Sequence, residues 1–381
     1  MVIKNLHIQH YRIYSDIRLE WDPHINLITG PNGAGKTNLI DAIHYMCMSR
    51  SFVTHNDSHI IHHQASSFCI QGTFSGSVRP SIHIQIDYAK GEGKKILVNG
   101  VTLDKITDLI GRVPVVVLSP SDRYLTHEGP EYRRQFLDAL ISQIDRSYLM
   151  NLISYRNILR QRNRLLQLFY ERGRVDYDEL APWNQQFVET AAALIHTRAL
   201  VCMEFQHHLH TMYATMAGIK HKPTLSYQST ISDPLSLSST QERLTSLLNQ
   251  QLAKDIERKT TTVGPHREDL LFKLDDLSLR QFGSQGQHRL FAMALKLSQL
   301  QYYSEKLDDL PILMLDDVFG DLDKEKTLLM MSMLQKHPGQ IFITSANAEL
   351  MIQALATNKA AYSIYHIQDG NVIQPSAIQY V

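Results

Sequence analysis

Residues 30–37 read GPNGAGKT, which matches the pattern Gly-x-x-x-x-Gly-Lys-Thr. The strand-like run INLIT (25–29) precedes this stretch, and the helix-like run NLIDAIHYMCM (38–48) follows it. A strand, a glycine-rich turn and a helix in this order form a P-loop. Its backbone N–H groups and the positive end of the helix bind phosphate. The stretch therefore predicts an α/β fold that binds a nucleotide.

The residue types of the P-loop each have a chemical reason. Glycines allow positive φ and let the backbone approach a phosphate closely. Lys36 is expected to reach the β- and γ-phosphates of ATP, and the Thr37 hydroxyl to ligate Mg²⁺. A chance glycine-rich turn is the alternative, and the two flanking elements argue against it. The candidate cofactor-binding residues are Gly30, Pro31, Asn32, Gly33, Ala34, Gly35, Lys36 and Thr37.

A second acidic motif completes the expected site. Residues 310–317 read LPILMLDD, an apolar strand that ends in two acids, as a Walker B motif does. Asp316 is expected to hold Mg²⁺ through its water shell, and Asp317 to orient the attacking water as a general base. On its own the stretch also fits a strand that ends in an acidic turn. Together with the P-loop it predicts ATP hydrolysis, with Asp317, Asp316 and Lys36 as catalytic residues.

The spacing of the motifs distinguishes between classes of P-loop protein. Lys36 and Asp316 are 280 residues apart (316 − 36), much farther than in simple P-loop kinases and GTPases. The stretch FGSQGQHR (282–289) precedes the second half and resembles the signature motif of the ATP-binding-cassette superfamily. That resemblance implies that Ser284, Gly286 and Gln287 bind the γ-phosphate held by a second protomer. GDLD (320–323) resembles the superfamily's D-loop, while no switch histidine follows QIFITS (340–345).

Periodicity divides the chain into three segments. Residues 1–125 and 261–381 read as the two halves of an ATPase lobe, with alternating strands and an Asn-Gly hairpin signal at 99–100. Residues 126–260 lack a strand pattern and are expected to form an α-helical lobe. Its second long helix is predicted to begin at Pro182 and to end before Gly218, and a third helix to span 241–258.

Composition limits where the protein acts. The 381 residues carry 38 basic and 38 acidic side chains, which excludes a uniformly basic nucleic-acid coat. The N-terminus MVIKNLHIQHYRIY has no apolar signal-peptide core, and no apolar run approaches the ~20 residues needed to span a bilayer. The three cysteines have no CxxC spacing, which fits a reducing compartment. We therefore expect a cytoplasmic protein without membrane contact.

Seven stretches together resemble the RecF family, the bacterial DNA replication and repair ATPases of the SMC-like branch. Their quoted sequences cover most of the chain, and the arginine-rich blocks and GPHREDL are more specific than the P-loop. They are LHIQHYRIYSD (6–16), GPNGAGKTNLIDAI (30–43), LSPSDRYLTHEGPEYRRQFLD (118–138), YRNILRQRNRLL (155–166), GPHREDL (264–270), SQGQ (284–287) and LDDVFGDLD (315–323).

The resemblance implies a fold and a function. The fold would be an ABC/SMC-type P-loop ATPase head, a mixed sheet with helices, plus an inserted α-helical lobe without long coiled coils. ATP with Mg²⁺ would drive a homodimer that binds single- or double-stranded DNA at gaps, and slow hydrolysis would release the DNA. The protein would act with RecO and RecR to load RecA in recombinational repair, and so contribute to the SOS response to DNA damage.

Two other functions remain open at this point. In the first, ATP binding only sets the dimer state of an adaptor that recruits repair partners, and hydrolysis is dispensable. In the second, the chain is the nucleotide-binding subunit of a transporter. The Asp316–Asp317 pair favours an ATPase over the adaptor. The absent switch histidine and the 280-residue spacing count against the transporter.

Clustered arginines are the candidate DNA contacts. Residues 131–174 hold nine Arg, no Lys and four acids, and such a stripe can neutralise phosphates. The alternative is a solvated helix face with intrahelical ion pairs, and Arg162 departs from the stripe because it points toward the apolar side. Some of these arginines would face the partner protomer instead. The candidates are Arg133, Arg134, Arg156, Arg160 and Arg164.

Two further features have competing interpretations. Arg12 follows the first strand, where related ATPase heads bring an arginine near the nucleotide, but it also fits an ordinary surface arginine. Histidines cluster at 55–63 and 207–210, and no acidic residue has ligand spacing with either cluster. Lineage composition is therefore favoured over metal binding.

Overall fold

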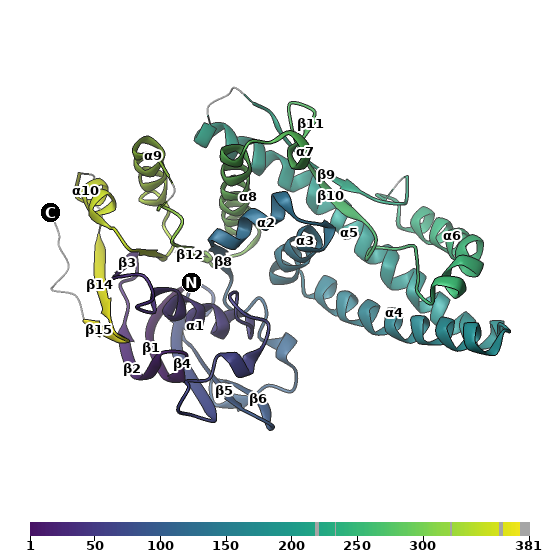
Figure 1. The fold of residues 1–381 in the computed structure, drawn as a ribbon, viewed down its shortest axis with the longest axis horizontal. Coiled ribbons are helices and arrows are strands. Elements are labelled where there is room, and N and C mark those ends of the chain that lie inside the picture. The colour runs from purple at the N-terminus through teal and green to yellow at the C-terminus, as the bar shows by residue number, and fades with distance from the viewer. Residues whose placement is uncertain (218–220, 233, 321, 358–360, 374–381) are drawn as a thin grey trace. The chain divides into compact units, whose positions relative to one another are not determined.

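The structure is a computed structural model that describes residues 1–381 except 218–220, 233, 321, 358–360 and 374–381 (Figure 1). The chain divides into two compact units. Unit 1 contains Met1–Asp122 and Lys296–Val381, and unit 2 contains Arg123–Leu295. The P-loop and the Walker B acids therefore belong to unit 1, whereas the signature residues and the arginine-rich helices belong to unit 2. Each unit is described by itself.

The first sheet of unit 1 is antiparallel, with strand order β2-β1-β4-β5-β6-β7 among the described residues. Asn99 and Gly100 join β6 to β7 with φ values of 51° and 79°, so the predicted Asn-Gly hairpin is confirmed. The strands are β1 (Val2–Tyr11), β2 (Tyr14–Glu20), β4 (Ser67–Ser75), β5 (Ile82–Ala89), β6 (Gly93–Val98) and β7 (Val101–Thr102).

The second sheet of unit 1 has the order β15-β14-β3-β13-β12-β8, and all of its pairs are parallel except β14 with β15. Its central strands are buried on both faces, which explains why they read as continuous apolar runs. The strands are β3 (Ile25–Thr29), β8 (Val115–Leu118), β12 (Ile312–Asp316), β13 (Ile341–Ser345), β14 (Tyr362–Gln368) and β15 (Asn371–Ile373).

Helix α1 (Lys36–Met48) joins the two sheets into one core. It contacts β1, β4 and β5 of the first sheet and β8, β12 and β13 of the second. Eleven of its 13 residues are buried, among them Leu39, Ile40 and Ile43, which explains why the helix is apolar on nearly every side. The P-loop helix is thus fixed in the core of unit 1, between the two sheets. Helices α9 (Lys324–Leu334) and α10 (Glu349–Thr357) pack against each other in the C-terminal half.

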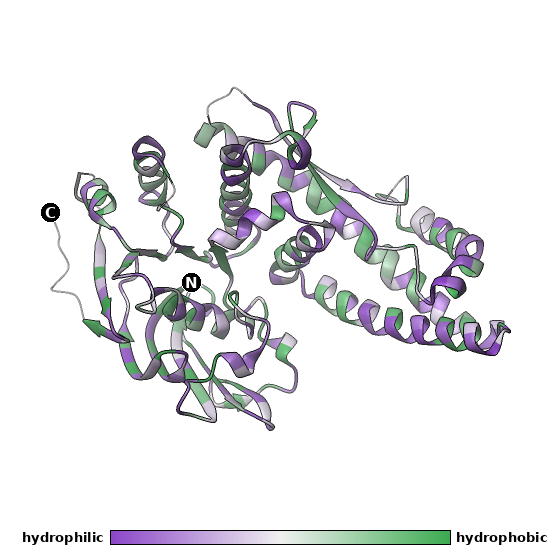
Figure 2. Ribbon diagram, viewed as in Figure 1, coloured by the Kyte–Doolittle hydropathy of each residue, from purple (hydrophilic) through white to green (hydrophobic). Residues whose placement is uncertain are grey.

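The helices of unit 2 are arranged around a helical hairpin. The two longest of its described helices, α4 and α5, pack against each other, and Gly173 ends α4 with a left-handed φ of 66°. Along α4, hydrophilic and hydrophobic residues alternate (Figure 2), and the buried residues of this helix include Leu152, Leu165 and Phe169. The helices are α2 (Tyr124–His127), α3 (Pro130–Ile144), α4 (Arg146–Arg172), α5 (Tyr177–Ala217), α6 (Leu237–Arg258) and α7 (Leu279–Phe282), and α8 (Gln285–Lys306) continues into unit 1.

Two local predictions for the helical lobe were wrong. The long helix begins at Tyr177 rather than at Pro182, because Asp176 accepts a hydrogen bond from the Glu179 N–H and so begins the helix before the proline. The helix ends at Ala217, and Gly218 itself lies outside the described residues. The lobe also contains a strand, β9 (Pro223–Gln228), whose short alternation of polar and apolar residues (TLSYQ) the sequence analysis missed.

Strand β9 also explains why unit 2 extends beyond the expected boundary at residue 260. It pairs with β10 (Asp269–Leu274), which in turn pairs with β11 (Leu277–Ser278). This small antiparallel sheet draws 261–295 into the helical unit, whereas the sequence placed that segment in the ATPase lobe. The observed units agree with the expected architecture of a mixed-sheet ATPase lobe plus a helical lobe, and no long coiled coil occurs in the described residues.

Candidate ATP-binding site and the arginines of unit 2

The P-loop backbone has the conformation that its glycines permit. Gly30 follows β3 with a φ of 145°, and a Cβ added there would lie 2.2 Å from the Ile367 carbonyl oxygen. Gly35 precedes α1 with a φ of 107°, and its added Cβ would lie 2.2 Å from the Ile13 side chain. Gly33 has a φ of 82° with open space around it. Pro31, Asn32 and Ala34 complete the turn, so residues 30–35 form one loop between β3 and α1, and Lys36 and Thr37 begin the helix.

Lys36 is held by the loop that it belongs to. Its ammonium group donates hydrogen bonds to the carbonyl oxygens of Gly30 at 2.8 Å and Pro31 at 2.9 Å. Burial lowers the pKa of Lys36, and the nearby charges of Asp317 and Asp316 oppose that shift. The lysine is therefore a largely desolvated cation held against the loop, which suits contact with phosphate oxygens.

Asp316 lies opposite Thr37 at the carboxyl end of β12. The Thr37 hydroxyl donates to its carboxylate at 2.8 and 3.0 Å, and the Thr344 hydroxyl of β13 donates at 2.8 Å. Burial raises the pKa of Asp316, and these two hydrogen bonds partly counteract the shift. Parallel pairing of β12 with β13 brings Thr344 to this point, a residue that the sequence analysis missed. Only its position at the end of a buried strand could have indicated it.

The residues at this point fit a magnesium ion. Mg²⁺ in nucleotide sites binds one or two protein oxygens and takes its other ligands from phosphates and water. The Thr37 hydroxyl and the buried Asp316 carboxylate are such oxygens, and they already lie within hydrogen-bond distance of each other. When bound, Mg²⁺ would neutralise charge on the β- and γ-phosphates.

Asp317 has a strained backbone and an exposed side chain. Its φ is 49°, and its N–H donates to the Thr344 hydroxyl at 3.0 Å and to the Thr344 carbonyl oxygen at 3.3 Å. A left-handed conformation costs a residue with a side chain about 1 kcal/mol. Buried Asp316 and exposed Asp317 thus divide the acidic pair into one group suited to a metal and one accessible to water. Asp321 of the D-loop lies outside the described residues, and Asp323 caps α9 by accepting from the Lys326 N–H.

The signature residues form the start of α8 in unit 2. The Gln287 N–H donates to the Ser284 hydroxyl at 3.2 Å, and the Ser284 N–H donates to the Gln287 side-chain oxygen at 2.8 Å. This reciprocal pair is a capping box, which satisfies two backbone donors at the helix N-terminus. Gly286 has open space where a Cβ would lie. The structure therefore positions Ser284, Gly286 and Gln287 as one local motif.

Two of the five candidate DNA contacts are already engaged by the protein. Arg133 is 4% exposed; it pairs with Asp269 at 2.7 Å and also donates to the Glu128 carbonyl oxygen. Its proposed role in DNA contact is therefore withdrawn, because its guanidinium has no free face. Arg156 is exposed but pairs with Asp138 at 3.0 Å.

The other three arginines have no ionic partner in the described residues. Arg134 is half-buried and donates to the Glu268 carbonyl oxygen at 2.9 Å. Arg160 and Arg164 are exposed on α4. Their guanidinium charges are therefore available to neutralise DNA phosphates.

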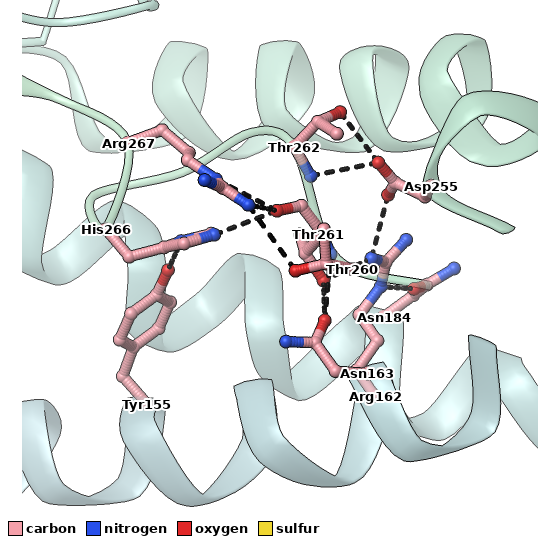
Figure 3. Close-up of polar contacts among 10 residues, drawn as sticks. All are labelled: Tyr155, Arg162, Asn163, Asn184, Asp255, Thr260, Thr261, Thr262, His266 and Arg267. Carbon is pink, nitrogen blue, oxygen red and sulfur yellow. Dashed lines mark hydrogen bonds and ion pairs between the residues drawn. The ribbon is translucent and has the colours of Figure 1, made fainter. Parts of the chain in front are cut away.

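The buried Arg162 forms the centre of a polar network that the sequence did not predict (Figure 3). It is fully buried and bonds to Asp255 of α6 at 2.9 Å, to Thr261 at 2.6 Å and to Asn184 of α5 at 2.8 Å. Asp255 accepts in addition from the N–H and hydroxyl of Thr262. The arginine that departs from the stripe thus joins three helices to the loop that follows α6.

The remaining candidates have structural surroundings. The Arg12 guanidinium lies 3.4 Å from the buried Asp41 carboxylate of α1 and 3.3 Å from the Ser51 hydroxyl. It is thus anchored to the P-loop helix. Neither histidine cluster forms a group of three or more metal-binding side chains in the described residues. Among the same residues, no helix has the length and apolarity needed to cross a membrane.

Comparison with known proteins identifies the family. The RecF/RecN/SMC N-terminal domain family matches residues 2–372. DNA replication and repair protein RecF from Salinibacter ruber is 36% identical over 375 residues, covering 97% of this chain and 91% of the relative. The RecF of Chloroherpeton thalassium is 36% identical over 349 residues, covering 91% of this chain and 95% of the relative.

Solved structures agree with the sequence matches. The structure of the recombination mediator protein RecF with ATP in the RecFOR pathway is similar with a TM-score of 0.91 and 29% identity, and 98% of each chain is covered. An SMC head bound to the C-terminal winged-helix domain of ScpA shares the fold, with a TM-score of 0.59 at 14% identity over 98% of this chain and 97% of that one.

The fold and the site define a P-loop ATPase with an SMC-type head. Within that class, the chain belongs to the RecF family of DNA replication and repair proteins. Two similar solved RecF structures contain ATP or ATPrS.

Proposed function

We propose that this protein is an ATP-gated DNA clamp of recombinational repair and replication. ATP with Mg²⁺ binds to the P-loop and drives a homodimer, in which the signature residues of one protomer contact the γ-phosphate held by the other. The dimer binds single-stranded and duplex DNA at gaps, and hydrolysis releases it. In the cytoplasm the clamp acts with RecO and RecR to load RecA, and so contributes to the SOS response.

One observation carries the proposal of ATP chemistry. Thr37 of the P-loop donates to Asp316, 279 residues away, at 2.8 Å. The two motifs that must share one metal ion therefore meet. Burial lowers the pKa of Lys36, and the nearby charge of Asp317 opposes that shift, so the lysine and the acid lie close together. Lys36 would stabilise the charge on the transferred phosphate, and Asp317 would accept a proton from the attacking water.

Hydrolysis is expected to be slow and DNA-dependent. Related SMC heads and transporters usually carry glutamate where Asp317 stands, and aspartate is one methylene shorter. The shorter side chain would hold the attacking water less well, and a poorly oriented water loses much of the advantage of proximity. A turnover as fast as that of transport cassettes would contradict this expectation.

Light scattering tests the ATP-driven dimer. The mass of the wild-type protein and of Lys36→Met is measured with and without ATP and gapped DNA. The proposal predicts an ATP-dependent dimer that binds DNA in the wild type and a monomer under all conditions in the variant, because the variant loses the phosphate-binding ammonium. A variant that still dimerises with ATP would contradict the proposal.

An adaptor that does not need hydrolysis is a second candidate. The Asp317 side chain is exposed, and among the described residues nothing around it is buried in a way that only hydrolysis would require. Asp317→Asn distinguishes the two. The clamp predicts ATP binding with phosphate release reduced about 100-fold or more, since a general base contributes that much, together with slower release of DNA. Exposed Asp104→Asn is the matched control. Full repair activity in Asp317→Asn would favour the adaptor.

A further inference from the structure

The loop GPHRED (264–269) connects the segment after α6 to β10, and the ATP site does not use it. Its exposure is uneven: Gly264, Pro265 and Glu268 are buried, His266 is half-buried, and Arg267 is exposed. A loop with a single exposed residue must satisfy most of its polar groups inside the protein. The contacts that do so also fix the position of the one exposed side chain.

The first half of the loop is held from α4 and α5. Gly264 has a φ of 114°, and an added Cβ would lie 2.8 Å from the Phe187 ring, so only glycine fits. The buried Arg198 of α5 donates to the Pro265 carbonyl oxygen at 2.8 Å. The Tyr155 hydroxyl of α4 lies 2.5 Å from Nδ1 of His266 and donates to it, as Figure 3 shows.

The loop also bonds to the segment directly before it. Nε2 of His266 donates to the Thr261 carbonyl oxygen at 3.0 Å, and the Arg267 N–H donates to the Gly264 carbonyl oxygen at 2.9 Å. Thr261 is itself bonded to Arg162 and to Asn163 of α4. The loop thus lies on the buried Arg162–Asp255 pair, in which both side chains are 0% exposed. A buried ion pair contributes little net stability. We therefore interpret this pair as one that fixes the position of the loop relative to α4 and α6.

The second half of the loop is equally constrained. The Glu268 carboxylate accepts from the hydroxyls of Tyr227, Ser229 and Thr230. Asp269 accepts both hydrogen bonds of the Arg133 pair. The acids of the loop are therefore satisfied by neutral donors and by Arg133, and neither of them pairs with Arg267.

Arg267 is left with a free face. Its Nε and Nη2 each lie 3.2 Å from the Thr261 carbonyl oxygen, and Nη2 lies 3.4 Å from the Thr260 hydroxyl. Its Nη1 has no partner in the described residues, and no carboxylate there pairs with it. Arg134 flanks the loop, and within the described part of the chain it donates only to the Glu268 carbonyl oxygen. Burial lowers the pKa of His266 to about 4, and the charges of Arg267 and Arg134 add to that shift, so two cations surround a neutral ring.

We propose that the 264–269 loop is a phosphate-binding element in which Arg267, assisted by Arg134, contacts the phosphate backbone of DNA. The inference rests on the DNA-binding function proposed above. Asn163 bonds to Thr261, and Arg160 is three residues before Asn163 on the same face of α4. The loop therefore continues the exposed arginine stripe of α4. An arginine held in place before binding loses little freedom on contact, which suits it to phosphate recognition.

The test compares Arg267→Gln with the wild type and with Arg243→Gln. Arg243 is exposed on α6 of the same unit, so its variant makes the same change of charge elsewhere. Fluorescence anisotropy gives the Kd for gapped DNA with ATP at a series of salt concentrations. Arg267→Gln is expected to weaken binding about ten-fold, since hydrogen bonds to charged groups are worth that much. Its salt slope is expected to fall by about 0.9, the loss of one phosphate contact. Arg243→Gln should match the wild type.

Two further measurements exclude other roles for Arg267. Arg267→Lys should recover most of the salt slope, because it restores the charge without the bonds to Thr261. Binding of a fluorescent ATP analogue and the ATP-dependent dimer, both measured without DNA, should be unchanged in Arg267→Gln.

The outcomes separate this inference from the proposed function. A wild-type Kd and salt slope in Arg267→Gln would overturn the inference and leave the clamp standing. Loss of the dimer or of nucleotide affinity in Arg267→Gln without DNA would also overturn it, because the arginine would then contact the partner protomer or the nucleotide. Failure of the wild-type protein itself to bind DNA with ATP would overturn the proposed function, and this inference with it.

Discussion

At the residue scale, Gly30 and Gly33 of the P-loop differ in what surrounds them. Both have positive φ, but only Gly30 is also confined, by the Ile367 carbonyl oxygen of β14. Gly30→Ala should therefore abolish ATP binding and lower the free energy of unfolding by about 2 kcal/mol or more. Gly33→Ala should cost about 1 kcal/mol, from backbone strain alone. ATP titration and urea unfolding of both variants check this, and equal effects would contradict the steric account.

His44 of α1 makes the stability of unit 1 depend on pH. The residue is 8% exposed, and Nδ1 lies 3.0 Å from the Arg50 carbonyl oxygen. Burial first, and the Arg50 charge second, lower its pKa to about 3. In the unfolded chain the ring takes up a proton below about pH 6.5. Its stabilising contribution is therefore complete above pH 6.5 and is lost progressively as the pH falls toward 3.

His44→Gln tests this pH dependence. The free energy of unfolding should fall less between pH 7 and pH 4.5 in the variant than in the wild type. Asp41 of the same helix has a raised pKa and an effect of opposite sign, but both proteins contain it, so the difference between them isolates His44. An identical pH dependence would contradict the assignment.

At the scale of elements, the pair Arg162–Asp255 joins α4 to α6. Arg162→Met should lower the free energy of unfolding of unit 2 by about 3–5 kcal/mol, because it leaves a buried carboxylate without its cation. Arg160→Met, on the exposed side of the same helix, should change it by no more than about 0.5 kcal/mol. Urea unfolding followed by circular dichroism measures both. A loss in Arg162→Met as small as that in Arg160→Met would show that the pair does not hold the helices together.

Helix α4 also shows how much of the structure could be predicted from the sequence. The periodicity of α4 indicated that Arg162 faces the apolar side, and this is confirmed by its complete burial. The partner, Asp255, is 93 residues away, and no local pattern links the two. The prediction that Arg133 contacts DNA has the same weakness. The sequence alone does not distinguish an arginine in a buried ion pair from a solvated one, because its partner Asp269 lies on a distant strand. Strand β9 was missed because its pairing with β10 is likewise long-range.

At the scale of the whole molecule, the chemistry near the nucleotide was the predictable part. The P-loop and the Walker B strand are short, contiguous motifs whose residue types follow directly from phosphate and metal binding. The contact between Thr37 and Asp316 follows from them once the sheet is parallel. The boundary of unit 2 was not predictable from the sequence. Residues 261–295 read as part of an ATPase lobe, and they belong to unit 2 because β10 pairs with β9.

The zero net charge also has a meaning at this scale. Nine arginines lie within 131–174, whereas 301–330 hold eight acids and three lysines. Two of these acids, Asp316 and Asp317, lie at the candidate Mg²⁺ site of unit 1, and the arginines lie in unit 2. An even balance over the chain is thus compatible with ATP chemistry in one unit and phosphate contacts in the other.

The most direct test of the account is the affinity of the wild-type protein for gapped DNA with and without ATP and Mg²⁺, measured by fluorescence anisotropy at one fixed salt concentration. If nucleotide bound between Lys36, Thr37 and Asp316 gates the clamp, the Kd should be at least ten-fold lower with ATP than without it. Lys36→Met should have the weaker affinity under both conditions. An affinity of the wild type that is the same with and without ATP would contradict the account.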